Sequence, residues 1–386
     1  MTYENVPPDV ERTQPATNPF VFARPIDPAW MVDREDELGL LAERIETGVN
    51  TRLSSPRDYG KTSLLRRALA DARAAGMGAV LVDLYGVRTP AQAAAQIERA
   101  YEALPAGPLR RALIGLRRRG GQVGLQTPVG GASLGFAGAD GERALLDSLD
   151  LPLGIHERTG SRMVVAFDEF QAVLGADLDG LIRSVIQHHG AGVTYVFSGS
   201  HPGMMLRLFA DRRRPFYGQA APLELGRLPR DRLAEHIAAG FERTGKRADE
   251  GLDWLLDLVD GHPQRSMLFA HLLWRHTSAG ARADDAAWAS AHEEAWSYLQ
   301  GDFEATWDGL SRIEAGVVET VAAGVQSLTG KVAREVHGLP RGSAAPEAAK
   351  RLVERGLLSG RTGELDLVDP VFARWVAAGR RWLPPW

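Results

Sequence analysis

The chain has 386 residues, 44% hydrophobic and 24% charged, which is the balance of an ordinary soluble globular protein with room for two or three domains of about 150 residues each. It contains no cysteine, which excludes disulfides, cysteine metal sites and thiol catalysis, and its net charge of -4 argues against a protein that coats nucleic acid indiscriminately. No apolar run reaches the roughly 18 residues of a membrane span and the chain begins without a signal-peptide pattern, so a cytoplasmic protein without membrane contact is expected.

Strands and helices alternate in the first part of the chain. Residues 1–30 are rich in Pro, Asn and Thr, which predicts an extended N-terminal segment, and "VDREDELGLLAERI" then predicts a helix beginning near Glu35. "NTRLSS" and "TSLLRRALADARAAG" predict a strand, a loop and a helix. Further strands are predicted, with helices between them, at "GAVLVDLYG", "RMVVAFDEF", "GVTYVFSGS" and "APLELGRL". The alternation predicts an α/β core over residues 31–228, with a parallel sheet flanked by helices.

The pattern changes twice after this. Residues 105–160 are rich in Gly and Arg, which predicts an insertion with a mobile loop, and its arginines Arg117, Arg118 and Arg119 suit an exposed face. Residues 229–300 show helical periodicity throughout, which predicts a helical lid subdomain. Residues 301–386 show three helical segments and then two short apolar runs around a turn, the order of a winged helix-turn-helix domain.

The stretch "SSPRDYGKTS" suits a phosphate-binding loop of the form G-x-x-x-x-G-K-[ST]. Gly60 lets the backbone approach the phosphates, Lys61 supplies positive charge, and the Thr62 hydroxyl suits Mg²⁺. Ser55 stands in place of the first glycine, a change that strains the loop only if that position needs positive φ. The alternative is a strand, turn and helix that contain Gly-Lys-Thr by chance. The residues expected to hold the nucleotide are Ser55, Pro56, Arg57, Asp58, Tyr59, Gly60, Lys61, Thr62 and Ser63.

A second motif strengthens this interpretation. In "VVAFDEF", Asp168 and Glu169 follow an apolar strand. Asp168 is expected to hold Mg²⁺ together with Thr62, and Glu169 to orient and deprotonate a water that attacks ATP. The alternative role for the two carboxylates is to cap the next helix.

These motifs resemble the archaeal-type branch of the STAND ATPases, which are close relatives of AAA+ proteins. The resemblance extends over roughly residues 30–280, with a weaker match to the winged helix, and it rests on "SPRDYGKTSLL", "VVAFDEFQAV", "YVFSGS", "RPFYGQA" and "DGHPQ". The family's loop usually opens Gly-Pro-Arg, so Ser55 departs from it. The resemblance implies a place beside the base for Arg34 and Glu35, a γ-phosphate sensor at Ser198, and a base-side element at His262 and Pro263. For Ser198 and the neighbouring Ser200 the alternative is a turn-forming pair, and for Gly-His-Pro a helix boundary.

Several arginines are candidates for an arginine finger, the residue from a neighbouring subunit that completes the site of many such ATPases. Arg214 is the favoured candidate, with Arg265 after the Gly-His-Pro element as another. Arg212 and Arg213 are expected to be solvated. A homo-oligomer, or a protein partner bound through the winged helix, follows from this interpretation.

The winged helix could also present Lys350, Arg351 and Arg355 to DNA, with Arg361 in its wing. Residues 301–386 contain eleven Lys or Arg against eleven Asp or Glu, so no basic field favours DNA there, and packing within the protein or against a partner is favoured instead. The sequence thus predicts a Mg²⁺-dependent, slow ATPase that acts as a nucleotide-controlled switch or motor. The alternative is a DNA-binding regulator or scaffold in which ATP is only a ligand.

Overall fold

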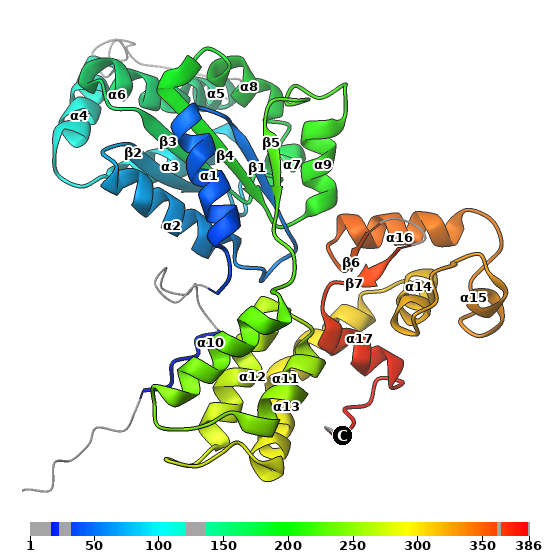
Figure 1. Cartoon of the computed structure of the whole chain (residues 1–386). Helices are drawn as coiled ribbons and strands as arrows, with labels where there is room; N and C mark the ends of the chain where they lie inside the picture. Colours follow the sequence, from blue (N-terminus) through cyan, green and yellow to red (C-terminus); the bar gives the residue numbers. More distant parts are fainter. Residues whose placement is uncertain (1–16, 23–31, 121–135, 361–363, 385–386) are drawn as a thin grey trace, which may run out of the picture.

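The computed structural model describes residues 17–22, 32–120, 136–360 and 364–384, and it contains a five-stranded sheet (Figure 1). All its strands are parallel and lie in the order β2-β3-β4-β1-β5. They are β1 (Thr51–Ser54), β2 (Gly78–Asp83), β3 (Met163–Asp168), β4 (Val193–Gly199) and β5 (Ala221–Glu224). The predicted parallel α/β sheet is therefore confirmed, and its carboxyl edge collects the loops that follow β1, β3 and β4.

Helices cover both faces of the sheet because successive side chains of its buried strands point to opposite faces. Val164 and Ala166 of β3 pack on one face with α1 (Glu35–Thr47) and α2 (Lys61–Ala74). Val165 and Phe167 face the other layer. That layer comprises α3 (Pro90–Glu102), α4 (Pro108–Gly120), α5 (Phe136–Leu149), α6 (Leu151–Thr159), α7 (Ala172–Gly175), α8 (Asp179–Ile186) and α9 (Pro202–Ala210). A 3-10 turn, Gly190–Gly192, leads into β4.

The described residues of the segment 105–160 are largely helical where the sequence suggested an insertion with a loop. Leu113, Leu145 and Ile155, from α4, α5 and α6, are buried in the same core as Phe167, so these helices form part of the layer over the sheet. Glycines and repeated arginines hid the periodicity, although Arg117 lies on the outer side and pairs with Glu98 and Glu102. Residues 121–135 of the predicted insertion and the side chains of Arg118 and Arg119 lie outside the described residues.

The C-terminal half is helical, as predicted. Four helices follow the sheet: α10 (Arg230–Glu242), α11 (Asp249–Val259), α12 (Pro263–His276) and α13 (Asp285–Asp308). The winged-helix part comprises α14 (Arg312–Ala322), α15 (Lys331–Glu335), α16 (Ala344–Glu354), the antiparallel hairpin of β6 (Leu358–Ser359) and β7 (Asp366–Leu367), and α17 (Pro370–Ala377). Arg361 lies outside the described residues.

The lid and winged-helix helices have one continuous apolar core rather than two, and α11 and α14 both contact α17. The described part of the N-terminal segment, residues 17–22, forms neither helix nor strand and inserts Phe20 into this core, where its ring lies 5.6 Å from that of Phe241. The rest of the predicted extended segment, residues 1–16 and 23–30, lies outside the described residues. Among the helices that are described, none is long and apolar enough to cross a bilayer.

Candidate nucleotide site

The loop after β1 has the backbone of a phosphate cradle. Gly60 has φ +87° and precedes the first turn of α2, and Asp58 is also left-handed at φ +65°. Ser55 lies outside the left-handed region and is buried, so a side chain at this position causes no backbone strain. The condition under which serine would disturb the loop is therefore not met.

Lys61 lies across its own loop. Its Nζ donates hydrogen bonds to the backbone oxygens of Ser55 at 2.9 Å and Pro56 at 2.7 Å, and to Ser55 Oγ at 3.2 Å. Burial lowers the pKa of the ammonium to about 8, although Glu169, Asp168 and Asp58 oppose this effect. The carbonyl oxygens carry only partial negative charge and balance the Lys61 ammonium incompletely. A dianionic phosphate in the cradle would supply a full negative charge to pair with it.

Asp168, at the end of β3, connects the start of α2 to the end of β4 through its two carboxylate oxygens. Thr62 Oγ1 at the start of α2 donates to Asp168 Oδ2 at 2.9 Å, and Ser198 Oγ at the end of β4 donates to Oδ1 at 2.8 Å. Ser198 is fully buried, so its hydroxyl orients the carboxylate from behind. The structure thus brings together residues that the sequence separates by 136 positions.

The Glu169 carboxylate is held by a cluster of polar side chains, Ser200, Gln171 and His201, that the sequence did not predict. Its backbone is left-handed at φ +53°, and its Oε2 accepts hydrogen bonds from Ser200 Oγ at 2.7 Å and from Gln171 Nε2. His201 Nδ1 lies 3.1 Å from both donors, and burial lowers the pKa of this imidazole, as does the nearby Arg57. Gln171 is close to Glu169 in the sequence, and His201 is next to Ser200. Only the fold brings these four residues together around one carboxylate.

A cavity of about 570 Å³ opens beside the cradle. Arg57, Asp58, Gly60, Lys61, Thr62 and Ser63 of the predicted loop line it, with Glu169 and Ser200. The remaining lining residues are Val21, Phe22, Tyr85, Pro263, Gln264 and Met267. Apolar groups from the N-terminal segment and α12 are suited to a flat purine, and sequence patterns did not single out Val21, Phe22, Tyr85 or Met267.

Two residues expected beside the base and the favoured arginine-finger candidate do not line this cavity. Arg34 is buried, donating to Glu37 Oε1 and to the Gly226 carbonyl oxygen, each at 2.7 Å. Its neighbour Glu35 is exposed. Arg214 pairs with the buried carboxylate of Asp179 at 3.1 Å.

His262 is buried against the loop rather than open to the cavity. Its ring packs edge-on against Tyr59 at 5.0 Å between centroids, and its Nδ1 accepts from the Arg265 backbone amide, which caps α12. Burial lowers its pKa to about 4, so it is neutral at pH 7. The element Gly-His-Pro therefore connects the lid to the phosphate loop, and only Pro263 reaches the cavity.

The winged helix contacts the same loop. Tyr59, which stands between Asp58 and Gly60 in the loop, is buried, and its hydroxyl donates to the Val368 carbonyl oxygen at 3.0 Å. Arg265 Nε donates to Asp369 Oδ2 at 2.8 Å, its Nη2 forms an ion pair with the same oxygen at 2.8 Å, and Asp369 Oδ1 caps α17. Arg227, after β5, pairs with Asp260 in the lid and with Asp366 in the wing.

The geometry defines a P-loop α/β protein, and comparisons with known proteins agree. No protein-family model and no curated protein matches the sequence. Among solved structures, a Walker-type ATPase of Pyrococcus abyssi is similar with a TM-score of 0.67 and 19% identity, over 91% of this chain and 98% of that one. The Aeropyrum pernix ORC2 protein in complexes with ADPNP and ADP is similar with a TM-score of 0.58 and 17% identity, over 92% and 95% of the two chains. At such identities the similarity establishes only the shared fold, a parallel α/β sheet followed by a helical region and a small C-terminal hairpin, and it leaves the AAA+ and STAND assignments predictions.

Proposed function

We propose that this protein binds ATP and hydrolyses it slowly with Mg²⁺. The chain Thr62–Asp168–Ser198, with hydrogen bonds of 2.9 and 2.8 Å, supports this most directly, because it joins the phosphate loop to two strand ends. A chance Gly-Lys-Thr sequence would not bring a carboxylate to the hydroxyl of its threonine.

The residues present fit a magnesium ion. Mg²⁺ in nucleotide sites is bound by one or two carboxylates or hydroxyls, with phosphate and water completing its shell. Thr62 and Asp168 offer one hydroxyl and one carboxylate, and the described residues contain no group of three acidic or histidine side chains that would form an all-protein cage. When bound, the ion would neutralise charge on the β- and γ-phosphates.

The chain's own residues supply the rest of the chemistry. Lys61 leaves the Ser55 and Pro56 carbonyl oxygens and donates to the terminal phosphates. Glu169, held by Ser200 and Gln171, accepts a proton from the water that attacks the γ-phosphate. Ser198 keeps Asp168 in place.

Two substitutions separate binding from hydrolysis. Lys61→Ala is expected to abolish ATP binding measured by calorimetry, and Glu169→Gln to preserve binding while reducing phosphate release by ~100-fold or more. Glu335→Gln, an exposed change in α15, is the matched control and leaves both unchanged. Equal hydrolysis by Glu169→Gln and the unaltered protein would remove Glu169 from the mechanism.

The nucleotide is proposed to act on the other parts of the chain as a switch. Tyr59, Arg227 and Arg265 connect the core (31–228) and the lid (229–300) to the winged helix (301–386) at Val368, Asp366 and Asp369. Because Tyr59 is part of the loop that must enclose phosphate, filling the cradle disturbs its contact with Val368. ATP binding is thereby coupled to docking of the winged helix.

The winged helix is better suited to packing within the chain than to reading DNA. Ala345, Ala348 and Ala349 of α16 are buried, and Arg351 and Arg355 both approach Glu314 Oε1, at 3.6 and 3.5 Å. The end of α16 also packs against α9 of the core. Duplex DNA is therefore expected to bind weakly, and Lys350→Ala to leave that binding unchanged in a salt titration.

A further inference from the structure

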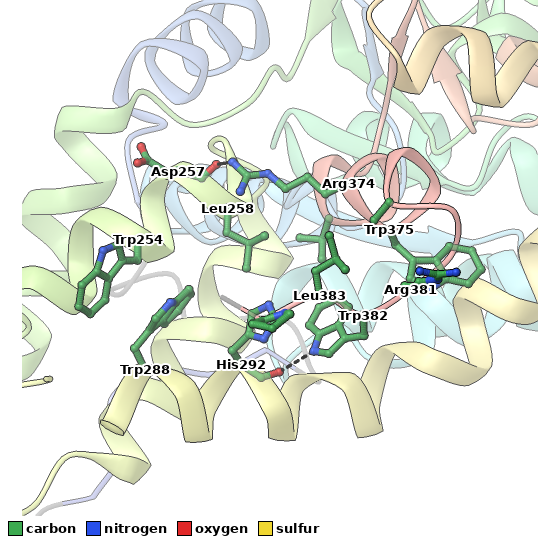
Figure 2. Close-up of a pocket in the computed structure, with 13 residues that line it drawn as sticks. Trp254, Asp257, Leu258, Trp288, His292, Arg374, Trp375, Arg381, Trp382 and Leu383 are labelled. Carbon is green, nitrogen blue, oxygen red and sulfur yellow. Dashed lines mark hydrogen bonds between the residues drawn. The ribbon is translucent and has the colours of Figure 1, made fainter. Parts of the chain in front are cut away.

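A second cavity, of about 410 Å³, lies between the lid and the winged helix, away from the nucleotide site (Figure 2). Its volume is within the ~300–1,000 Å³ of small-molecule sites. It is lined from α11 by Trp254, Asp257 and Leu258, from α13 by Trp288 and His292, and from α17 and the following segment by Val371, Arg374, Trp375, Ala378, Arg381, Trp382, Leu383 and Pro384. It shares no lining residue with the cavity beside the phosphate loop.

The walls of this cavity are unusually aromatic. Four of the nine tryptophans in the chain line it, and the ring of Trp382 stacks on that of His292 at 4.4 Å between centroids. The Trp382 indole nitrogen also donates to the His292 backbone oxygen at 3.2 Å, which holds this ring in place (Figure 2). Rigid indole faces bind flat aromatic rings by offset or edge-on contact.

Positive charge gathers at this cavity without a matching carboxylate. Arg374 donates to the backbone oxygen of Asp257, whereas the Asp257 carboxylate pairs with Arg230 at 2.7 Å. Arg381 is exposed, and no hydrogen bond or ion pair joins it to any residue within the described ranges. His292 adds no charge at pH 7, because burial lowers its pKa to about 4. Planar guanidinium groups bind carboxylates and sulfonates through paired hydrogen bonds.

We propose that this cavity binds a small, flat aromatic anion, with its rings against the tryptophans and its acidic group at Arg381 (Figure 2). A neutral aromatic molecule would leave the Arg381 guanidinium unpaired, and an aliphatic anion would not use the indole faces. Three residues of α17 line the cavity, Val371, Arg374 and Trp375, and Asp369, which caps this helix, pairs with Arg265 of the lid. An occupant therefore acts on the helix that connects to the nucleotide site; this last step alone rests on the proposed function.

The proposal is tested with 2-naphthoate and its neutral analogue 2-naphthamide, measured by calorimetry on the nucleotide-free full chain. Naphthoate is expected to bind at least ~10-fold more tightly than the amide. Arg381→Gln is expected to remove that preference and to leave amide binding unchanged, whereas Arg341→Gln, an exposed arginine elsewhere in the winged helix, changes neither. Lys61→Ala is expected to bind naphthoate normally, which separates this cavity from the phosphate loop.

A second variant fills the space instead of removing a charge. Ala378→Phe adds a ring to a partly exposed position at the end of α17, and is expected to abolish binding of both probes while far-ultraviolet circular dichroism stays unchanged. Equal affinity for acid and amide, unchanged binding in Ala378→Phe, or no heat with millimolar naphthoate would each overturn the proposal. The proposal would also be overturned if the protein bound a single-stranded oligothymidylate but not naphthoate, and if Arg381→Gln weakened that oligonucleotide binding.

Discussion

Replacing Asp369 with asparagine isolates the charge that joins the lid to the winged helix. Asparagine is as good an N-cap as aspartate, so α17 keeps the cap that Asp369 Oδ1 provides to Val371 and Phe372. Arg265, however, loses a carboxylate that accepts a hydrogen bond from its Nε and forms an ion pair with its Nη2, both at 2.8 Å. The side chains of this pair are only 14% and 15% exposed, so solvent replaces little of what is lost.

The size of the effect follows from that burial. Removing one partner of a buried ion pair costs ~3–5 kcal/mol when the other charge is left unpaired. The asparagine amide oxygen can still accept one hydrogen bond from Arg265, which lowers the expected loss to about 2 kcal/mol in the free energy of unfolding. By contrast, Asp366→Asn breaks a pair whose carboxylate is 61% exposed, and is expected to cost less than ~1 kcal/mol.

A double-mutant cycle measures this interaction directly. Urea unfolding of Asp369→Asn, Arg265→Gln and the double variant is expected to give a coupling free energy of about 2 kcal/mol. If the pair restrains the lid, Asp369→Asn also raises the rate of ATP hydrolysis and the sensitivity of residues 301–386 to protease. A coupling below ~0.5 kcal/mol, or an equal loss in Asp366→Asn, would refute the reasoning.

The pH dependence provides a further check on the same pair. Burial by itself would raise the pKa of Asp369, but Arg265, His262 and hydrogen bonds outweigh burial and hold this pKa below its usual value. A carboxyl with a lowered folded-state pKa stabilises the protein above the unfolded pKa of ~3.9, and this contribution is lost as the pH falls through the folded value. The difference in stability between the unaltered protein and Asp369→Asn is therefore expected to vanish in acid.

Further predictions concern the cradle and the core. The pKa of Lys61 in the nucleotide-free protein is about 8, so above pH 8 this side chain must take up a proton when phosphate binds. ATP affinity measured by calorimetry is therefore expected to fall up to ~10-fold per pH unit above 8. In Lys61→Arg the affinity is expected to stay constant over the same range. Ser55→Gly is expected to change ATP affinity less than ~3-fold, because Ser55 has no positive φ to relieve; a larger gain would contradict the backbone argument. Phe197→Ala is expected to lower the free energy of unfolding in urea by ~3–5 kcal/mol, because the ring of Phe197 is fully buried and its centroid lies 4.7 Å from that of Phe170. The exposed Tyr217→Ala is the control for this change, and a comparable loss there would contradict it.

The sheet and its cradle could be predicted because their signals are local. The apolar run before Asp168 and the Gly-Lys-Thr sequence after β1 each describe one strand and the turn that follows it, and parallel strands bring such turns to one edge. Helices α4, α5 and α6 were not predicted. Glycine and arginine mask the apolar face of an amphipathic helix, and only packing against the sheet shows which side is covered.

The amino-acid sequence by itself determined that this chain is an α/β P-loop protein with a helical lid and a winged helix, because spacing along a chain specifies single elements and their order. Only the tertiary structure decided that Ser200 and Gln171 hold Glu169, and that Tyr59 of the phosphate loop bonds to Val368, 309 residues away. It also decided that tryptophans from three helices and the segment after α17 enclose a cavity beside Arg381. Contacts of this kind depend on how helices pack together, and no local pattern in the sequence encodes that packing.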